Sequence, residues 1–203
     1  MGKTLDSRYY SCVILTSVIN SLSKSQSKNV SIANNQQERL IGWITGFVDG
    51  EGCFSVGFVK QSNKKEENRL RKGYKTGYQV SHEFAVTQGE SSLESLRLLK
   101  KYFQVGQLII NRRYDNHKEH LYRYVVRRRS ELKEVIIPFF KKYGLRTAKK
   151  KDFKMFKKCV DLMEKGEHLT HSGIIKIAQI TEQMNRKKSR SKLIRILRDH
   201  TPN

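Results

Sequence analysis

The sequence predicts an α+β protein built on an antiparallel sheet. Several short segments alternate apolar residues with small or polar ones, as in FSVGF from Phe54 to Phe58, which is the pattern of a half-buried strand. Other segments space apolar residues three and four apart, as at Leu93, Leu96 and Leu99, which is typical of an amphipathic helix. The two kinds of segment alternate along the chain, so strands and helices are expected within one fold.

These spacings assign the expected strands and helices along the chain. Strands are expected over residues 53–58, 79–88, 108–113 and 120–127, the last two forming a hairpin around a turn at 115–117. Helices are expected over residues 38–50, 92–103, 149–165 and 173–186. A further helix is expected to begin at Ser130 as its N-cap and to be interrupted at Pro138, because proline removes a helical hydrogen bond. The segment 60–75 is dense in charge and predicts a mobile hairpin.

The charge balance narrows the class of partner. The 203 residues include 41 Lys and Arg against 19 Asp and Glu, a formal net charge of +22. Such an excess favours a polyanionic partner. No apolar run approaches the length of about 20 residues that spans a bilayer, so no membrane partner is expected. Three cysteines without a C-x-x-C spacing indicate a reducing, intracellular compartment, either a bacterial cytoplasm or an organelle.

Composition divides the chain into three parts. Residues 1–37 are rich in Ser, Asn and Gln and are interpreted as a partly flexible N-terminal extension. Residues 38–165 hold the alternating strands and helices and are expected to form the core. Residues 166–203 are expected to form a basic, helical C-terminal region.

Three glycines form the most informative pattern. Gly42, Gly46 and Gly50 lie four residues apart, so in a helix they would form a ridge without side chains. Glycine inside a helix costs about 1 kcal/mol relative to alanine. Close approach to a second helix is the usual reason for accepting that cost.

Two carboxylates, Asp49 and Glu51, follow at the C-terminal end of this helix. Acidic groups there are unfavourable by about 0.3–1 kcal/mol each, because that end of the helix dipole is already negative. A divalent cation would reverse the sign of this effect. Mg²⁺ characteristically takes one or two protein carboxylates and completes its shell with water and phosphate oxygens.

The segment from Ile44 to Gly52, ITGFVDGEG, resembles the motif of the LAGLIDADG homing endonucleases, with Glu51 replacing the more usual Asp. The strand ending FAVTQ at Gln88 and the basic segment LRTAKKKDF at 145–153 are also similar to that family. The resemblance covers roughly residues 38–165. It implies a fold with an αββαββα core and an antiparallel sheet that forms a DNA-binding saddle, followed here by extra C-terminal helices.

The resemblance also implies an activity. The expected protein is an intron-encoded, sequence-specific endonuclease that makes Mg²⁺-dependent double-strand breaks in a long, near-palindromic DNA site. Mn²⁺ or Ca²⁺ is expected to substitute in the site, Ca²⁺ without cleavage. Only one motif occurs in the sequence, so a pseudo-symmetric monomer is excluded and a homodimer is expected, with Gly42, Thr45 and Gly46 at its interface.

Roles carry over residue by residue. Glu51 is the expected metal-binding acid, the Gly50 carbonyl is a second ligand, and Asp49 supports the helix end. Gln88 resembles the glutamine that orients solvent around the attacking water. The basic-pocket lysine matches Lys149 best, with Lys150 and Lys151 left open. Related enzymes often carry arginine four residues after the glutamine, where this chain has Ser92, which leaves the composition of the basic pocket open.

Recognition is expected from the polar face of the sheet. If Phe54, Val56 and Phe58 face the core, the intervening side chains face DNA, and Ala85 falls in the same row. Glu83 is expected to read a base, since a carboxylate on a DNA face is otherwise costly. The residues expected to contact DNA are Ser55, Gln61, Lys75, Gln79, Ser81, Glu83, Asn111, Arg113, Arg123 and Arg127.

Two other classes fit parts of the sequence. A non-cleaving binder on the same scaffold, either an intron maturase or a transcription regulator, would use the basic surface alone. The combination of Glu51, Gln88 and a lysine cluster argues against it, because a pure binder needs no such set. A basic RNA-packaging protein would explain the charge but not a glycine ridge with an acidic end.

Overall fold

A computed structural model of the chain describes residues 34–61, 64–66, 69–71, 73–112, 119–184 and 189–199. The chain divides into two compact units, residues 1–43 and 44–203, and the sheet and all the labelled helices belong to the second. Within the described ranges, no helix is both long and apolar enough to cross a membrane. The predicted N-terminal extension lies outside these ranges except for residues 34–37, which are helical.

The glycine-rich segment is a helix, as predicted. Residues 34–51 are helical and run directly into the first strand. Ile44 and Val48, one turn apart, are fully buried, whereas Gly46 and Gly50 are exposed. The helix must give way to the strand at Gly52, where a Cβ atom would lie 2.7 Å from the carbonyl oxygen of Val48. Glycine is therefore required at this junction.

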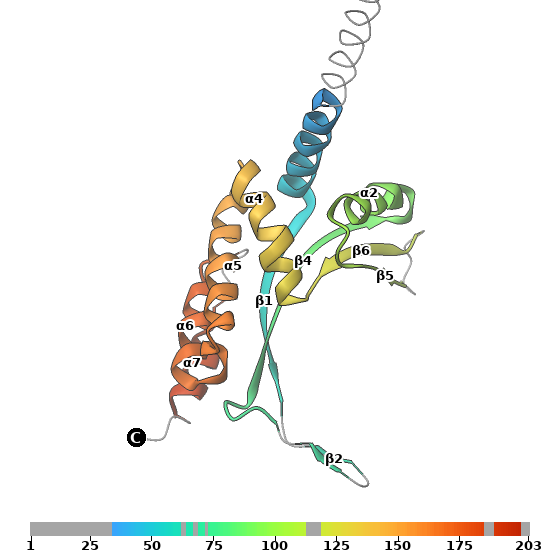
Figure 1. Cartoon of the computed structure of the whole chain (residues 1–203). Helices are drawn as coiled ribbons and strands as arrows, with labels where there is room; N and C mark the ends of the chain where they lie inside the picture. Colours follow the sequence, from blue (N-terminus) through green and yellow to red (C-terminus); the bar gives the residue numbers. More distant parts are fainter. Residues whose placement is uncertain are drawn as a thin grey trace, which may run out of the picture. The chain divides into compact units, whose positions relative to one another are not determined.

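Four antiparallel strands form the central sheet in the order β1-β4-β6-β5 (Figure 1). Their bounds are β1 Gly52–Lys60, β4 Tyr78–Gly89, β6 Leu121–Val126 and β5 Gln107–Asn111. All four predicted strands are confirmed. A separate antiparallel pair, β2 Lys64–Glu66 and β3 Arg69–Arg71, lies within the charged segment that predicted a hairpin.

The other helices lie where the sequence places them, with bounds that differ by five residues at most. They are α2 Leu93–Phe103, α3 Arg129–Glu131, α4 Ile137–Tyr143, α5 Lys149–Glu164, α6 His171–Thr181 and α7 Ser191–Asp199. Two 3₁₀ turns, η1 Glu90–Ser92 and η3 Glu167–Leu169, and a π-helical turn, η2 Leu132–Ile136, connect them. Both α6 and α7 lie within residues 166–203.

The predicted break at Pro138 is wrong. The helical run from α3 through η2 to α4 is continuous, and Pro138 occupies the first turn of α4, directly after the wider π turn. The π turn just before Pro138 changes the backbone hydrogen-bonding pattern at this point, so the proline ring fits without ending the helical run. Ser130 is not the N-cap either, because the cap position is Arg128, whose side chain makes no capping hydrogen bond.

An aromatic cluster joins the helices to one face of the sheet. The Phe54 ring in β1 lies 5.0 Å from that of Phe84 in β4, 5.7 Å from Phe140 in α4 and 5.2 Å from Phe153 in α5. Each such pair contributes about 0.5–1.5 kcal/mol beyond the burial of its surface. Tyr124 in β6 extends the cluster, and its hydroxyl donates to the carbonyl of Val105 at 3.0 Å. The helices therefore cover the apolar face, and the opposite face carries the polar side chains.

His82 occupies an unusual place on the helix-covered face. It lies between the buried Val80 and Phe84 in the same row of β4. Both of its ring nitrogens are shielded from solvent and have no hydrogen-bond partner. The neighbouring charges belong to Arg129 and His168, which lie 3.4 Å apart. Burial first, and then the charge of Arg129, hold the pKa of His82 at about 4, below its ordinary 6.5.

This arrangement predicts acid sensitivity. The unfolded chain takes up a proton near pH 6.5, whereas the folded chain resists until about pH 4, so stability should fall as pH falls through that window and level off below it. The full difference corresponds to about 3 kcal/mol, which solvent near the partly exposed ring reduces to about 1–2 kcal/mol. The pKa of His168 is lowered too, and acts in the same direction.

Thermal unfolding between pH 7.5 and pH 4 measures the effect. His82→Leu removes the titrating ring from its apolar surroundings and should lose less stability over this range than the unmodified protein. His171→Gln, at the half-buried first position of α6, is the comparison variant and should keep the full loss. Equal losses in all three proteins would contradict the assignment to His82.

Candidate nucleic-acid interface and cleavage site

Asp49 connects the C-terminal end of helix 34–51, called the motif helix below, to the loop before α5. Its carboxylate accepts hydrogen bonds from the backbone N–H of Arg146 at 2.7 Å, from that of Thr147 at 3.2 Å and from the Thr147 hydroxyl at 2.8 Å. Burial alone would raise the pKa of Asp49, but these bonds outweigh it and lower the pKa. Its acceptors are thus already engaged within the chain, which fits the expected supporting role. Sequence reasoning missed Arg146 and Thr147 as its partners.

Glu51 is placed differently, although it is only two residues away. Its side chain is exposed at the end of the helix, and within the described part of the chain its carboxylate has no hydrogen-bond or ion-pair partner. A carboxylate at a helix C-terminus without a partner is electrostatically unfavourable. The arrangement leaves both of its oxygens available to a ligand from outside the protomer.

Lys149 is the lysine that reaches this helix end. It is the first residue of α5, and its ammonium donates to the carbonyl of Gly50 at 3.0 Å and also to the carbonyl of Gly52. These two carbonyls flank Glu51 in the sequence. Lys150 and Lys151 are exposed on the following turn. Of the three lysines that the sequence left open, the structure therefore brings Lys149 to the acidic helix end.

Gln88 lies at the same end of the sheet. Gly52, the first residue of β1, is opposite Val86 of β4, so Gln88 is two residues beyond this pair, where the motif helix meets the sheet. Its side chain is half-buried, and its partner across the ladder is Tyr122 in β6. The three segments that the sequence singled out, around Glu51, Gln88 and Lys149, thus converge at one edge of the fold.

The donor set at this edge fits a hard divalent cation. Glu51 offers carboxylate oxygens and Gly50 offers a carbonyl oxygen, which has a second lone pair beside the one used by Lys149. Oxygen donors of this kind are those that Mg²⁺ and Ca²⁺ prefer. Among the described residues no group of three or more His, Cys, Asp or Glu side chains comes together. Glu51 and the Gly50 carbonyl are therefore the two oxygen donors that this end of the helix offers to a cation.

The polar face of the sheet carries the expected DNA-contacting residues in register. Ser55 is opposite Glu83 and Gly57 is opposite Ser81. Gly57 leaves room for the Ser81 side chain, because a Cβ atom at position 57 would lie only 2.7 Å from the Ser81 hydroxyl oxygen and would clash with it. A hollow of about 370 Å³ lies over these pairs. Its lining is formed by Ser55, Val56, Gly57, Ser81, His82, Glu83 and Arg127.

The expected exposure of Ala85 is wrong. Ala85 lies in the row of Ser81 and Glu83, but it is only 3% exposed. Its neighbours across the two ladders are Cys53 and Val125, which flank its single methyl group. The polar face thus has a small apolar centre at Ala85 and Val125.

Glu83 does not stand alone on this face. Arg123 donates to one of its carboxylate oxygens at 2.6 Å and Arg127 to the other at 2.9 Å. Burial would raise the pKa of Glu83, but the two guanidinium groups outweigh it and lower the pKa. The carboxylate sets the positions of both arginines before any ligand arrives, a geometry that favours bidentate contacts. Its expected role as a base reader is thus joined to a role in positioning.

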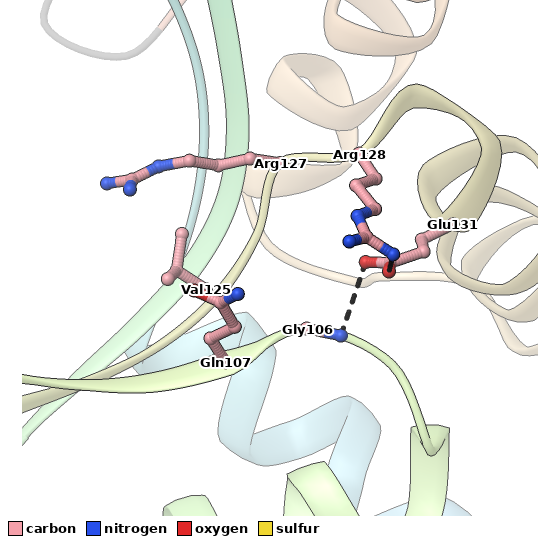
Figure 2. A pocket seen from close by; sticks show the side chains of 6 residues that line it. All are labelled: Gly106, Gln107, Val125, Arg127, Arg128 and Glu131. Carbon is pink, nitrogen blue, oxygen red and sulfur yellow. Dashed lines mark hydrogen bonds and ion pairs between the residues drawn. The ribbon is translucent and has the colours of Figure 1, made fainter.

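The three arginines that follow β6, Arg127 to Arg129, lie in three different surroundings. Arg127 is held by Glu83 on the polar face, and Arg128 turns in a different direction (Figure 2). The Arg128 guanidinium lies 3.6 Å from Glu131 beside a hollow of about 320 Å³, where Glu131 also accepts from the N–H of Gly106. Arg129 points inward and donates to the carbonyl of Met163 at 2.9 Å. Only the first two remain accessible for phosphate contacts.

The remaining predicted residues are distributed as follows. Gln61 and Gln79 are hydrogen-bonded to each other at 3.0 Å at the far end of β1 and β4. Lys75 is exposed in the turn before β4, and Asn111 is exposed at the end of β5. Arg113 lies outside the described residues.

The glycine ridge has open space in front of it. A Cβ atom built at Gly42, Gly46 or Gly50 would meet no atom within 4 Å. Thr45 is half-buried beside them. Packing within the described part of the protomer therefore does not require glycine at these positions, in contrast to Gly52.

The fold and the site together define the class of protein. The chain belongs to the LAGLIDADG endonuclease family, whose family model matches residues 44–160. It is 32% identical over 166 residues to a Neurospora crassa protein named "Probable intron-encoded endonuclease 2", covering 77% of this chain and 32% of that protein.

Solved structures of homing endonucleases show the same fold. The chain is 38% identical to I-TnaI with a TM-score of 0.61, over 78% of this chain and 96% of that one. It is 35% identical to I-LtrWI, solved bound to target DNA, with a TM-score of 0.63, over 76% of this chain and 47% of that one. The chain spans 25–32% of the length of the first curated relatives it matches.

Proposed function

We propose that the protein is a sequence-specific, intron-encoded homing endonuclease that cuts both strands of a long, near-palindromic DNA site. The observation that carries this proposal is the position of Lys149, whose ammonium bonds to the carbonyls on both sides of Glu51. A pure DNA-binding protein has no need of a carboxylate that lacks a partner among the described residues and lies beside a fixed ammonium. A hydrolase does, because it must bind a cation and stabilise negative charge in the same place.

Each residue has a defined task in this proposal. Glu51 and the Gly50 carbonyl would hold Mg²⁺, which supplies charge stabilisation for the attacking and leaving oxygens when bound. The Lys149 ammonium would donate to the phosphate as negative charge builds on it. Gln88 would orient the attacking water, and Asp49 would keep the helix end in place through the loop at Arg146 and Thr147. Mn²⁺ should support the reaction, and Ca²⁺ should bind without cleavage.

The working unit in this proposal is a homodimer. The exposed ridge of Gly46 and Gly50, where an added Cβ would meet nothing, allows the close approach of a second identical helix. A two-fold pair would bring two copies of Glu51 together and present two polar sheets to one duplex. Two-fold symmetry accounts for a near-palindromic target, since each protomer reads one half-site. In support of this unit, the chain covers 47% of the I-LtrWI chain, close to one half.

One experiment tests the reaction. The protein is incubated with plasmids carrying a randomised insert library and with the sequence that flanks its own gene, with Mg²⁺, with Ca²⁺ and with a chelator. We expect a double-strand cut in a single sequence with Mg²⁺ only, by a species of dimer mass in light scattering. Binding without any metal-dependent cut would instead support the non-cleaving maturase or regulator on the same scaffold. Cleavage by a monomer would contradict the homodimer.

A further inference from the structure

The β1–β4 ladder extends beyond the rest of the sheet. β1 and β4 pair from Gly52↔Val86 to Lys60↔Tyr78, whereas β6 pairs with β4 only from Phe84 to Gly89. The part of the ladder from Ser55↔Glu83 to Lys60↔Tyr78 is therefore a two-stranded ribbon, which is visible in Figure 1 as the stretch of β1 and β4 that leaves the sheet. Two-stranded ribbons are marginally stable unless another element packs on them.

The C-terminal helices supply that element. Arg190, just before α7, places its guanidinium carbon 5.6 Å from the centre of the Phe58 ring in β1. Its Nε is shielded from solvent, so the side chain is part of the packing and not a free surface charge. The backbone N–H of Arg190 donates to the Glu182 carboxylate at 2.8 Å, which ties the segment to the end of α6.

A second contact region lies nearer the end of the ribbon. Ile196 and Leu197 of α7 and His171 of α6 face the strand ends across a hollow of about 640 Å³. The opposite wall is formed by Lys60, Tyr74, Lys75, Thr76, Gly77 and Tyr78. The turn on that wall is ordered by its own bonds, since Gln61 N–H donates to Gly77 and the buried Thr76 hydroxyl donates to Tyr78.

The supported stretch carries residues expected to contact DNA. Gln61, Gln79 and Lys75 all lie there, and the two glutamines are hydrogen-bonded to each other. At about 3.3 Å per residue, the ribbon from Ser55 to Lys60 reaches about 17 Å, which corresponds to about five base pairs at 3.4 Å each. These would be the outer base pairs of a half-site, because the ribbon leads away from Glu51.

We propose that the α6–α7 segment positions the β1–β4 ribbon, with Arg190 as the positioning residue, and thereby sets specificity for the outer base pairs of each half-site. The inference rests on the proposed function for its DNA target. It does not need that function for its structural part, which concerns the ribbon alone. Arg190 contacts no DNA in this account and acts through Phe58.

The first test needs no DNA. Hydrogen exchange is measured in the full chain for the N–H groups of Gln61, Gly77 and their neighbours. Arg190→Ala and Phe58→Leu remove the contact from opposite sides, and each should speed exchange about fivefold, the effect of losing one cation–π contact. Because both remove one interaction, the double variant should be no faster than either single variant. Arg190→Lys keeps a cation and should restore slow exchange. Unchanged exchange in both single variants overturns the inference.

The second test uses a library of targets with single base-pair changes. Arg190→Ala should lose about fivefold in discrimination at the outer positions and keep it at the central ones, with Arg195→Ala on the exposed face of α7 as the matched control. An equal loss at all positions would show a general structural role and overturn the specificity claim. If the unmodified protein recognises no DNA, the proposed function fails, while hydrogen exchange still decides whether the ribbon is supported.

Discussion

Replacing Glu51 by glutamine should reduce DNA cleavage by at least about a thousandfold, which corresponds to ~4 kcal/mol of transition-state stabilisation. Glutamine keeps the size of the side chain but removes the negative charge, so the proposed Mg²⁺ site would lose one of its ligands. DNA affinity should change by less than about threefold, because Glu51 lies at the end of the helix and not on the polar sheet face. The thermal stability should be unchanged or slightly higher, since a charge that opposes the helix dipole is removed.

Single-turnover cleavage with Mg²⁺ measures the rate, and fluorescence anisotropy with Ca²⁺ measures binding. Glu94→Gln, on the exposed surface of α2 where the carboxylate pairs with Arg97 three residues away, is the matched control and should cleave normally. If Glu51→Gln cuts at the rate of that control, the assignment of the metal-binding acid is wrong.

Replacing Lys149 by methionine should reduce cleavage by about a hundredfold or more, the cost of removing one donor to a developing oxyanion. Methionine keeps the length of the side chain but cannot donate to the carbonyls of Gly50 and Gly52. The helix end would lose a fixed positive charge, so a loss of about 0.3–1 kcal/mol in the free energy of unfolding is also expected.

The two neighbouring lysines provide the control for this variant. Lys150→Met and Lys151→Met remove the same charge from the same turn of α5, and both should cleave within about threefold of the unmodified protein. They also lower the net charge equally, so any general electrostatic effect on DNA binding cancels in the comparison. Equal losses in all three variants would show that only charge matters and would remove the special role of Lys149.

The sequence predicts the elements of this fold well because their periods are local. The alternation that predicts β1 and the spacing that predicts α2 are set by residues within one segment. The predicted break at Pro138 is wrong because the π turn before it changes the backbone hydrogen-bonding pattern of the helix. No local sequence pattern predicts such a turn. The Ala85 side chain was misjudged because its exposure depends on Val125, forty residues away on another strand.

The candidate site divides in the same way. Motif and resemblance were enough to single out Glu51, Asp49 and Gln88. The choice among the three lysines depends on how α5 lies relative to the motif helix in space. The spacing of residues in the sequence does not give this information. The partners of Glu83 come from β6 and the residue after it, so its surroundings depend on how β4 and β6 are registered. The metal, the catalytic roles and the homodimer stay predictions for the variants above to decide.

The lack of side chains on the glycine ridge affects how this fold can evolve. In the proposed homodimer this ridge would form a contact surface made largely of backbone, which carries few side chains that could distinguish one partner from another. Two diverged copies of the gene would therefore still produce chains able to pair with each other. Each copy could then alter its own sheet face independently, and the mixed pair would read a target whose halves differ. Freedom from palindromic targets would thus require only duplication, with no redesign of the contact between the helices.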